Sequence, residues 1–312
     1  MKPRRFWVLV TFWVLCAGGK AALADSFTFT TINVPGASGS GAVGINNNGQ
    51  IVGGFLAGGG AQGFLDSGGT FTTINVPGAG GTQLDSINSS GQIVGDFGDA
   101  SGTHGFLDNG GTFTTINGPG ATITNANGIN DAGKIVGGFE DSSGGHGLLD
   151  IGGVITTIDI PGATFTVADG INNSSQIVGE FGDASGVHGF LDNGGTFTTI
   201  DVPGAGILDA GAFGINNDGQ IAGTYFDASG VEHGFLDNGG TFSTIDVPGA
   251  SRTIAGGIND SGQIVGFYFD ASGGEHGFLA TVPEPGTLAL LGSGLIGLAV
   301  ALRRRSATGR RK

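Results

Sequence analysis

Basic residues are scarce in most of this chain. Of the 12 lysines and arginines, only Lys134 and Arg252 lie between residues 25 and 281, whereas 25 of the 26 acidic residues lie there. Two positive charges against 25 negative ones give this region a net charge of −23. Nucleic acid and anionic membrane surfaces repel such a region, so neither is expected as a partner. Divalent cations, cationic polymers and neutral glycans are compatible with it.

Residues 25–281 also contain no cysteine and no long apolar pattern of helical period. The one cysteine, Cys16, lies in an N-terminal segment that we expect to be removed, which leaves no thiol for disulfide or redox chemistry. Between residues 25 and 281 no apolar pattern of helical period extends over ten residues or more. The same region has no phosphate loop, zinc motif or nucleophilic-serine elbow. The sequence therefore predicts no cofactor, no metal site and no catalytic residue.

Residues 1–24 predict a secretory signal peptide. The segment has a basic start and ends in small residues at the two positions that a signal peptidase recognises. The basic residues are Lys2, Arg4 and Arg5, and the small ones are Ala22 and Ala24. The apolar run over 6–17 between them is too short for a comfortable membrane span, so cleavage is expected before Asp25. A lipid anchor on Cys16 is the alternative, although Leu15 stands where such signals have a small residue.

Residues 282–312 predict a sorting or anchor segment in three parts. Val282, Pro283, Glu284 and Pro285 come first, a 17-residue apolar run over 286–302 follows, and Arg303, Arg304 and Arg305 end it. The run is predicted to be a transmembrane helix about 26 Å long, slightly under the roughly 30 Å hydrocarbon core. Flanking residues can snorkel to close the difference. The arginines are expected to stay on the cytoplasmic side and to hold residues 25–281 outside.

This tail, VPEPGTLALLGSGLIGLAVALRRR, resembles the PEP-CTERM sorting signal of Gram-negative bacteria. The resemblance covers residues 282–305, and the three parts occur in the order that the family has. It implies recognition by an exosortase-type membrane protease, cleavage near the Pro-Glu-Pro, and release or attachment at the cell surface. The family is associated with exopolysaccharide production. A simple C-terminal anchor helix is the alternative.

A unit of about 42 residues fills the region between the two ends. Six copies are marked by Ile-Asn pairs spaced 42, 42, 42, 44 and 43 residues apart, which begin at Ile45, Ile87, Ile129, Ile171, Ile215 and Ile258. Each copy has four short segments rich in Ile, Val, Phe and Thr, bounded by Gly, Asn and Asp clusters, a pattern typical of strands and tight turns. Phenylalanine recurs at two positions of the unit, and copy three keeps them apolar with Leu148 and Ile155. This repetition indicates a stacked apolar core.

Four strands in about 42 residues, six times over, predict an all-β fold: a six-bladed β-propeller. Residues 25–281, the predicted repeat domain, begin with the fourth strand of the unit at 29–32 and end with the third at 276–279. The N-terminal strand is therefore expected to close the ring as the outer strand of the last blade. A β-solenoid is the alternative, and it would need terminal caps that the sequence does not contain.

The repeat also resembles the extracellular HAF family, which is named for a His-Ala-Phe motif. That motif is His-Gly-Phe here, at 104, 188, 233 and 276, and the Ile-Asn-x-x-Gly-Gln-Ile-Val-Gly segment is similar too. The likeness covers most of residues 27–280, but the central Ala is Gly throughout and the first copy has Gln62 in place of His. The resemblance implies an exported repeat protein without a defined activity.

Histidines and turn aspartates recur at equivalent places in the copies. The histidines are His104, His146, His188, His233 and His276, and the Asp-Ala-Ser-Gly turns begin at Asp99, Asp183, Asp227 and Asp270. On the third strand from the axis the histidines cannot gather around one ion, so we expect them to have structural, hydrogen-bonded roles. The turns offer oxygen ligands for calcium, but Asp and Ser are ordinary turn residues, and the alternating carboxylates of a calcium loop are missing.

The position two residues before each Ile-Asn pair is expected to face the channel from the innermost strand. It holds Val43, Asp85, Asn127, Asp169, Phe213 and Gly256 in the six copies. Two carboxylates facing one another across a channel, such as Asp85 and Asp169, suit acid–base cleavage of a glycan. No nucleophile or base motif accompanies them, and chance placement in an acidic chain explains them.

Together these features predict an exported, non-catalytic protein that is sorted to the cell envelope or extracellular matrix. It is expected to be a structural or glycan-binding component associated with extracellular polysaccharide. Its expected partners are an exosortase-type membrane protease and polysaccharide, with the membrane contacted through the C-terminal helix before processing. A glycan-active enzyme with carboxylates in the channel is the alternative. Ice adhesion is a third reading, disfavoured because a twisted blade does not present a flat threonine array.

Overall fold

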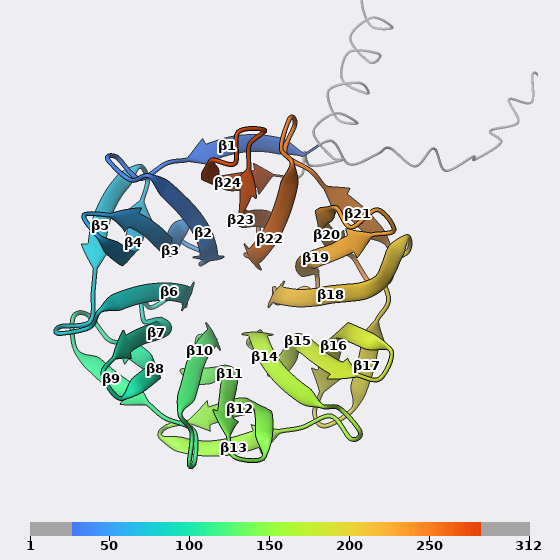
Figure 1. Cartoon of the computed structure of the whole chain (residues 1–312), viewed down its shortest axis with the longest axis horizontal. Helices are drawn as coiled ribbons and strands as arrows, with labels where there is room; N and C mark the ends of the chain where they lie inside the picture. Colours follow the sequence, from blue (N-terminus) through green and yellow to red (C-terminus); the bar gives the residue numbers. More distant parts are fainter. Residues whose placement is uncertain (1–26, 282–312) are drawn as a thin grey trace, which may run out of the picture.

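All regular structure in the described part of the chain is β-strand. The computed structural model describes residues 27–281, which contain 24 strands arranged in a ring (Figure 1). No helix in this range is long and apolar enough to cross a membrane. Several predicted features lie outside the described residues: the signal-peptide residues, the sorting motif from Val282 to Pro285, the helix over 286–302 and the arginines at 303–305.

Three sheets have four antiparallel strands each, ordered from the axis outward. Their strands are β2 (Gly39–Ile45), β3 (Gln50–Ala57), β4 (Gly60–Ser67) and β5 (Thr70–Ile74); β18 (Ala205–Ile215), β19 (Ile221–Asp227), β20 (Glu232–Asp237) and β21 (Phe242–Ile245); and β22 (Arg252–Ile258), β23 (Gln263–Phe269), β24 (Glu275–Thr281) and β1 (Thr28–Ile32).

The remaining strands form one 12-stranded sheet that consists of three further four-stranded groups. These are β6 (Gly81–Ile87), β7 (Ile93–Asp99), β8 (Gly102–Asp108) and β9 (Phe113–Ile116); β10 (Ile123–Ile129), β11 (Lys134–Asp141), β12 (Gly144–Ile151) and β13 (Val154–Ile158); and β14 (Phe165–Ile171), β15 (Gln176–Asp183), β16 (Gly186–Asn193) and β17 (Phe197–Ile200). Backbone strand pairing connects neighbouring groups of this sheet only through the single parallel pairs Ile123–Thr103 and Phe165–Gly145. The 12-stranded sheet is thus a chain of antiparallel groups rather than one continuous surface.

The two ends of the described chain meet in one sheet. Strand β1 pairs antiparallel with β24, from Thr28 opposite Thr281 to Ile32 opposite Gly277. This confirms the predicted pairing of the N-terminal strand with the C-terminal strands (Figure 1). An open solenoid would leave these strands far apart. The closed arrangement leaves neither terminal strand without a partner.

Apolar side chains pack between adjacent groups. The phenylalanine of the third strand is at most 1% exposed in every copy that has one, and Leu148 fills the same place at 0%. Each packs with side chains of its own group and of the preceding one: Phe190, for example, clusters with Ala168 of its own group and with Val136 of the group before it. The second recurring phenylalanine adds an edge contact, as where the Phe71 ring centroid lies 5.7 Å from that of Phe64. The predicted stacked core is therefore present.

A ring of buried asparagines ties the six groups together. The Asn of each Ile-Asn pair donates from Nδ2 to the backbone carbonyl of the same Asn in the next group. The bonds run from Asn46 to Asn88, Asn88 to Asn130, Asn130 to Asn172, Asn172 to Asn216, Asn216 to Asn259, and Asn259 back to Asn46, at 3.0–3.2 Å. Sequence analysis assigned these residues only to local turns. The last bond closes the circle between residues 213 positions apart.

Replacing Asn172 with alanine is expected to lower the free energy of unfolding by about 1–3 kcal/mol. The change removes the donors to Asn216 O and Gln176 Oε1, and it removes the acceptor for the backbone N–H groups of Ser174 and Gln176. Urea denaturation measures the loss. Ser174→Ala in the same turn is the control, expected to change stability by less than about 0.5 kcal/mol. Equal stability of the two variants would show that the asparagine ring does not hold the groups together.

Candidate functional site

The innermost strands approach one another closely around the axis. Each of the six has a β-bulge directly before its Ile-Asn pair, for instance between Ala126 and Gly128. A Cβ on Gly128 would lie 2.7 Å from the carbonyl oxygen of Asp169, and one on Gly214 would lie 2.6 Å from that of Gly256. At these two positions a side chain would collide with the neighbouring backbone, so glycine fits there, whereas the second copy has Ser86 at the equivalent place. The bulges therefore narrow the centre of the ring.

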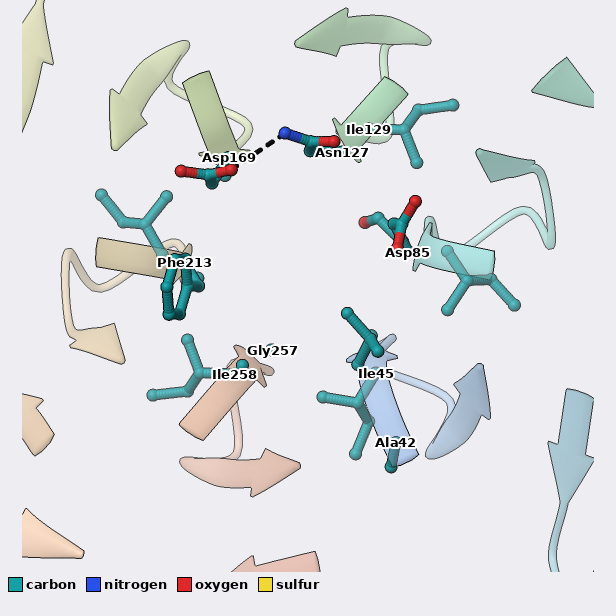
Figure 2. Close-up of a pocket in the computed structure, with 18 of the residues that line it drawn as sticks. Ala42, Ile45, Asp85, Asn127, Ile129, Asp169, Phe213, Gly257 and Ile258 are labelled. Carbon is teal, nitrogen blue, oxygen red and sulfur yellow. Dashed lines mark hydrogen bonds between the residues drawn. The ribbon is translucent and has the colours of Figure 1, made fainter. Parts of the chain in front are cut away.

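This constriction forms the floor of a cavity of about 380 Å³, which we call the axial cavity. The six isoleucines of the Ile-Asn pairs border it, and they also border a second, smaller cavity of about 70 Å³ on the asparagine side. The walls carry the six positions predicted to face the channel: Val43, Asp85, Asn127, Asp169, Phe213 and Gly256. Figure 2 shows Asp85, Asn127, Asp169 and Phe213 around the axis, each from a different inner strand. The predicted placement on the innermost strand is confirmed.

Asp169 is partly buried, and only one of its two carboxyl oxygens has a hydrogen-bond partner. Its Oδ1 accepts a hydrogen bond of 2.9 Å from Asn127 Nδ2 (Figure 2), whereas its Oδ2 has no hydrogen-bond partner. Burial raises the pKa of Asp169 well above its usual value, and the charges of Glu180 and, more weakly, Asp85 raise it further. The carboxyl of Asp169 therefore favours its protonated form.

Asp85 is in a similar state on β6. Its side chain is partly buried, and its buried Oδ2 also has no hydrogen-bond partner. Burial raises the pKa of Asp85 well above its usual value, and the charge of Asp96 and a hydrogen bond with it add to the effect. Burial raises the pKa of Asp96 as well. Two neighbouring carboxyls disfavour the ionisation of both at once.

Each of these two acids has a second acid beside it that was not expected from the sequence. Asp96 and Glu180 lie on the second strands β7 and β15, 11 residues after Asp85 and Asp169 respectively. The other four copies have no acid at either position: Val43 with Gly54, Asn127 with Gly138, Phe213 with Thr224, and Gly256 with Phe267. The sequence alone shows that two copies have acids at both positions and that four copies have an acid at neither. This pairing makes chance a poor explanation of Asp85 and Asp169.

The opposite wall of the axial cavity is apolar. Phe213, Phe267, Ile254 and Val43 line it, and in residues 27–281 no lysine, arginine or histidine reaches the lining. A Cβ on Gly211 would lie 2.7 Å from the Phe213 ring and 3.1 Å from Glu180 Oε2, so the acidic and aromatic sides meet there. The cavity is therefore acidic on one side and aromatic on the other.

Two further hollows continue from the axial cavity across one face. The first, of about 260 Å³, shares Val43 and Phe267 with it and is also lined by Gln83 and Glu275. The second, of about 520 Å³, shares Gln83 with the first and is bordered by Asp96. Glycines form much of both surfaces, which leaves room beside the backbone. The shared residues place the three hollows next to one another, as a path of depressions that leads from the axis outward beside the first two and the last repeat copies.

The histidines lie away from the axial cavity and are hydrogen-bonded, as predicted. His146 Nε2 lies 3.0 Å from Ser143 Oγ, and its Nδ1 lies 3.1 Å from Asp159 Oδ1. This order resembles that of a catalytic triad, but the Ser143 hydroxyl donates its hydrogen to Asp141 Oδ1 at 2.5 Å. The serine is therefore not poised to give its proton to the imidazole. In the described residues no three His, Cys, Asp or Glu side chains form a group that could hold a metal ion.

The turn aspartates are satisfied by their own loops. Hydrogen bonds from the Ser185 hydroxyl and backbone N–H lower the pKa of Asp183 to about 2. The same two bonds recur at Asp99, Asp141, Asp227 and Asp270. Each of these aspartates thus accepts hydrogen bonds from its own loop through Oδ1, which is the turn role expected from the sequence.

His233 makes the stability of the fold dependent on pH. Its Nδ1 lies 2.9 Å from Asp246 Oδ1 and its Nε2 lies 3.5 Å from Asp227 Oδ2. Burial alone would lower the pKa of His233, but the hydrogen bonds and charges of Asp246 and Asp227 outweigh it and raise the pKa. The stabilisation is therefore complete below the unfolded pKa of about 6.5 and is lost as the pH rises through the folded value.

Asp246→Asn is expected to weaken this pH dependence. Between about pH 6 and pH 8, the parent should lose more unfolding free energy than the variant, by less than about 1 kcal/mol because the pair is partly exposed. Urea titrations at the two pH values measure the difference. Asp218→Asn, an exposed aspartate elsewhere, should keep the parental slope. An unchanged slope in Asp246→Asn would contradict the role of His233.

Comparison with known proteins identifies one segment and the fold. Residues 281–305 match the PEP-CTERM protein-sorting motif, which is a recognition signal of exosortase and indicates an exported protein sorted to the cell surface. No curated protein matches the chain.

Three solved structures are similar in architecture. AofleA from Arthrobotrys oligospora has a TM-score of 0.52 at 12% identity, over 81% of this chain and 86% of that one. The Aleuria aurantia lectin in complex with Fucα1-6GlcNAc has a TM-score of 0.52 at 12% identity, over 78% and 91% of the two chains. TolB from Acinetobacter baumannii has a TM-score of 0.51 at 10% identity, over 79% and 64%. At these identities the likeness shows the fold alone, which is a β-propeller.

Proposed function

We propose that this protein is an exported, non-catalytic, six-bladed β-propeller that binds a glycan in the axial cavity. The blade count takes each four-stranded group as one blade. After export, an exosortase-type protease would process the chain near Pro283-Glu284-Pro285, with residues 286–302 spanning the membrane until then. The mature protein would remain at the cell surface or in the extracellular matrix, associated with exopolysaccharide.

One observation carries the binding role: the axial cavity has polar acceptors on one wall and phenyl rings on the other. Sugars present hydroxyls at their edges and C–H groups on their faces, so such a site satisfies both. The unpartnered Oδ2 atoms of Asp85 and Asp169 would accept hydrogen bonds from the ligand. Phe213 and Phe267 would pack against a sugar face.

The path leading outward supports a chain-like ligand. The adjoining hollows of about 260 and 520 Å³ continue from the cavity through Gln83 toward Asp96. A single sugar would occupy the axial cavity, and the following sugars would lie along the path. The structural likeness to a fucose-bound lectin adds weak support, since it reflects the fold only.

A glycan-active enzyme is the second candidate, because Asp85 and Asp169 face one cavity. An acid–base pair needs two carboxyls whose environments separate their pKa values. Here burial raises the pKa of both, so their environments shift the two carboxyls in the same direction instead of separating an acid from a base. This common direction favours binding over cleavage.

Binding and turnover can be separated with the full-length protein in detergent. Retention on immobilised polysaccharide, without new reducing ends, is the expected result, and Asp85→Asn should weaken retention. The exposed aspartate Asp218 provides the matched control, and Asp218→Asn should be retained as the parent is. Release of reducing ends that stops in Asp85→Asn would establish the enzyme instead. Absence of both retention and turnover would overturn the glycan-binding proposal.

A further inference from the structure

Within the described part of the chain, the axial cavity gathers acidic side chains without a cationic partner. Asp85 and Asp169 line it, and Asp96 and Glu180 act on them electrostatically from the second strands. Between residues 27 and 281 the only lysine and arginine are engaged elsewhere. Lys134 Nζ bonds Ser175 Oγ at 2.8 Å, and Arg252 lies 3.6 Å from Glu232 and 3.8 Å over the Phe269 ring. No cationic side chain in this range therefore neutralises the cavity.

The acids are placed for a ligand on one side of the axis. They come from the second and fourth repeat copies, and the copy between them contributes Asn127, whose amide holds Oδ1 of Asp169. This leaves the buried Oδ2 atoms of Asp85 and Asp169 as acceptors without donors. An unpaired acceptor in a buried site is costly, and two in one cavity indicate that a ligand supplies the donors.

We infer that the glycan bound in the axial cavity is an amino sugar with a free ammonium group. This inference rests on the proposed glycan-binding function and names its ligand class. An ammonium carries three N–H donors and a positive charge, so it would serve both Oδ2 acceptors and neutralise the acidic wall. Phe213 and Phe267 stand on the opposite wall, where they would stack on the sugar and attract the cation.

Neutral or acetylated sugars would satisfy the cavity less well. Their hydroxyl and amide groups supply donors but no charge, so the carboxyls would have to stay protonated. An ammonium instead favours the ionised form of a neighbouring carboxyl, as any opposite charge does. Because burial holds the pKa of Asp85 and Asp169 high in the free protein, binding of an ammonium is expected to release protons.

Three tetrasaccharides with the same β-1,4 backbone test the inference: those of glucosamine, N-acetylglucosamine and glucose. Titration calorimetry on the full-length protein, at about pH 6 where free amines are protonated, compares their affinities. The glucosamine tetramer should bind about 10- to 100-fold more tightly than the other two. Repeating the titration in buffers of different ionisation enthalpy should reveal the released protons.

Variants decide whether the cavity is responsible. Asp85→Asn and Asp169→Asn should each remove most of the preference for the ammonium sugar, together with the proton release. Asp218→Asn removes one exposed charge and should retain both, provided that the overall negative charge of the protein is not what attracts the ligand. Thermal denaturation of each variant checks that the ring remains folded.

Each contrary result has a distinct meaning. Equal or tighter binding of the glucose or N-acetylglucosamine tetramer would overturn the ammonium inference while leaving a glycan-binding protein. An equal loss in Asp218→Asn, or binding that requires calcium and is abolished by EDTA, would also overturn it. No binding of any of the three tetramers would overturn the ammonium inference, and failure of polysaccharide retention as well would remove the proposed function.

Discussion

Gly95→Ala is expected to lower the free energy of unfolding by about 3 kcal/mol or more, or to prevent folding. Gly95 lies on β7, and a Cβ at this position would be 2.0 Å from the carbonyl oxygen of Gln83 and 3.1 Å from Leu84 Cα. Both obstacles are backbone atoms of the paired strand, so no side chain can rotate away to make room. The strand would have to separate from β6 at the bulge beside Asp85.

The same strand offers a matched control. Gly98 also lies on β7, and a Cβ there would meet nothing within 4 Å. Gly98→Ala should therefore change stability by less than about 0.5 kcal/mol. Urea denaturation of the two variants compares a position where the added methyl group collides with backbone atoms and a position where it has free space. A similar stability for Gly95→Ala and Gly98→Ala would mean that β6 and β7 tolerate separation at the bulge, and that close backbone pairing does not require glycine there.

This obstacle recurs in every repeat copy. The equivalent glycines are Gly53, Gly95, Gly137, Gly179, Gly223 and Gly266, and in each a Cβ would lie 2.0 Å from a carbonyl oxygen of the innermost strand. They are the glycines of the Gln-Ile-Val-Gly segment or its variants. The recurrence of this glycine along the sequence is explained by lack of space for a side chain at the tightest pairing in the group.

The double replacement of Asp85 and Asp169 with asparagine is expected to stabilise the protein at neutral pH, by about 1–3 kcal/mol per site. Each carboxyl has a buried, unpartnered Oδ2, and burial raises the pKa of each. A raised folded pKa means that the folded state binds more protons than the unfolded state. Stability therefore falls as the pH rises from the unfolded value of about 4 through the folded value.

Urea denaturation from about pH 4 to pH 8 measures the effect. The parent should lose stability over this range through these two groups, and the double variant should lose less. Asp218→Asn, which removes an exposed carboxyl, should follow the parent. A double variant that is less stable than the parent at neutral pH would show that the two carboxyls stabilise the fold. Their structural role would then explain them without a ligand, and they would no longer support a binding site in the axial cavity.

Greater stability with weaker ligand binding would identify the acids as functional. Residues that reduce stability persist where a ligand compensates for them. The four acids occupy two of six otherwise similar repeat copies, whereas the asparagine ring and the glycine constriction serve nearly all of them. Residues that differ between the copies thus belong to the proposed binding site, whereas residues that recur in nearly all copies maintain the fold.

Much of the fold follows from the sequence because its determinants are local. Turn residues and short apolar segments recur every 42 to 44 residues, and these set the strands and their antiparallel order. The start of the domain with a fourth strand and its end with a third predict that β1 lies beside β24. The asparagine ring was missed, because its bonds join residues 42 or more positions apart and the same asparagines also suit a local turn.

The sequence by itself determined the repeat, the strand content, the sorting tail and which residues line the axis. Only the tertiary structure decided that Asp85 and Asp169, 84 residues apart, share one cavity with Phe213 and Phe267. A sequence period defines equivalent positions, but closure of the ring sets the distances between them. Burial, which gives these carboxyls their raised pKa values, depends on that closure as well.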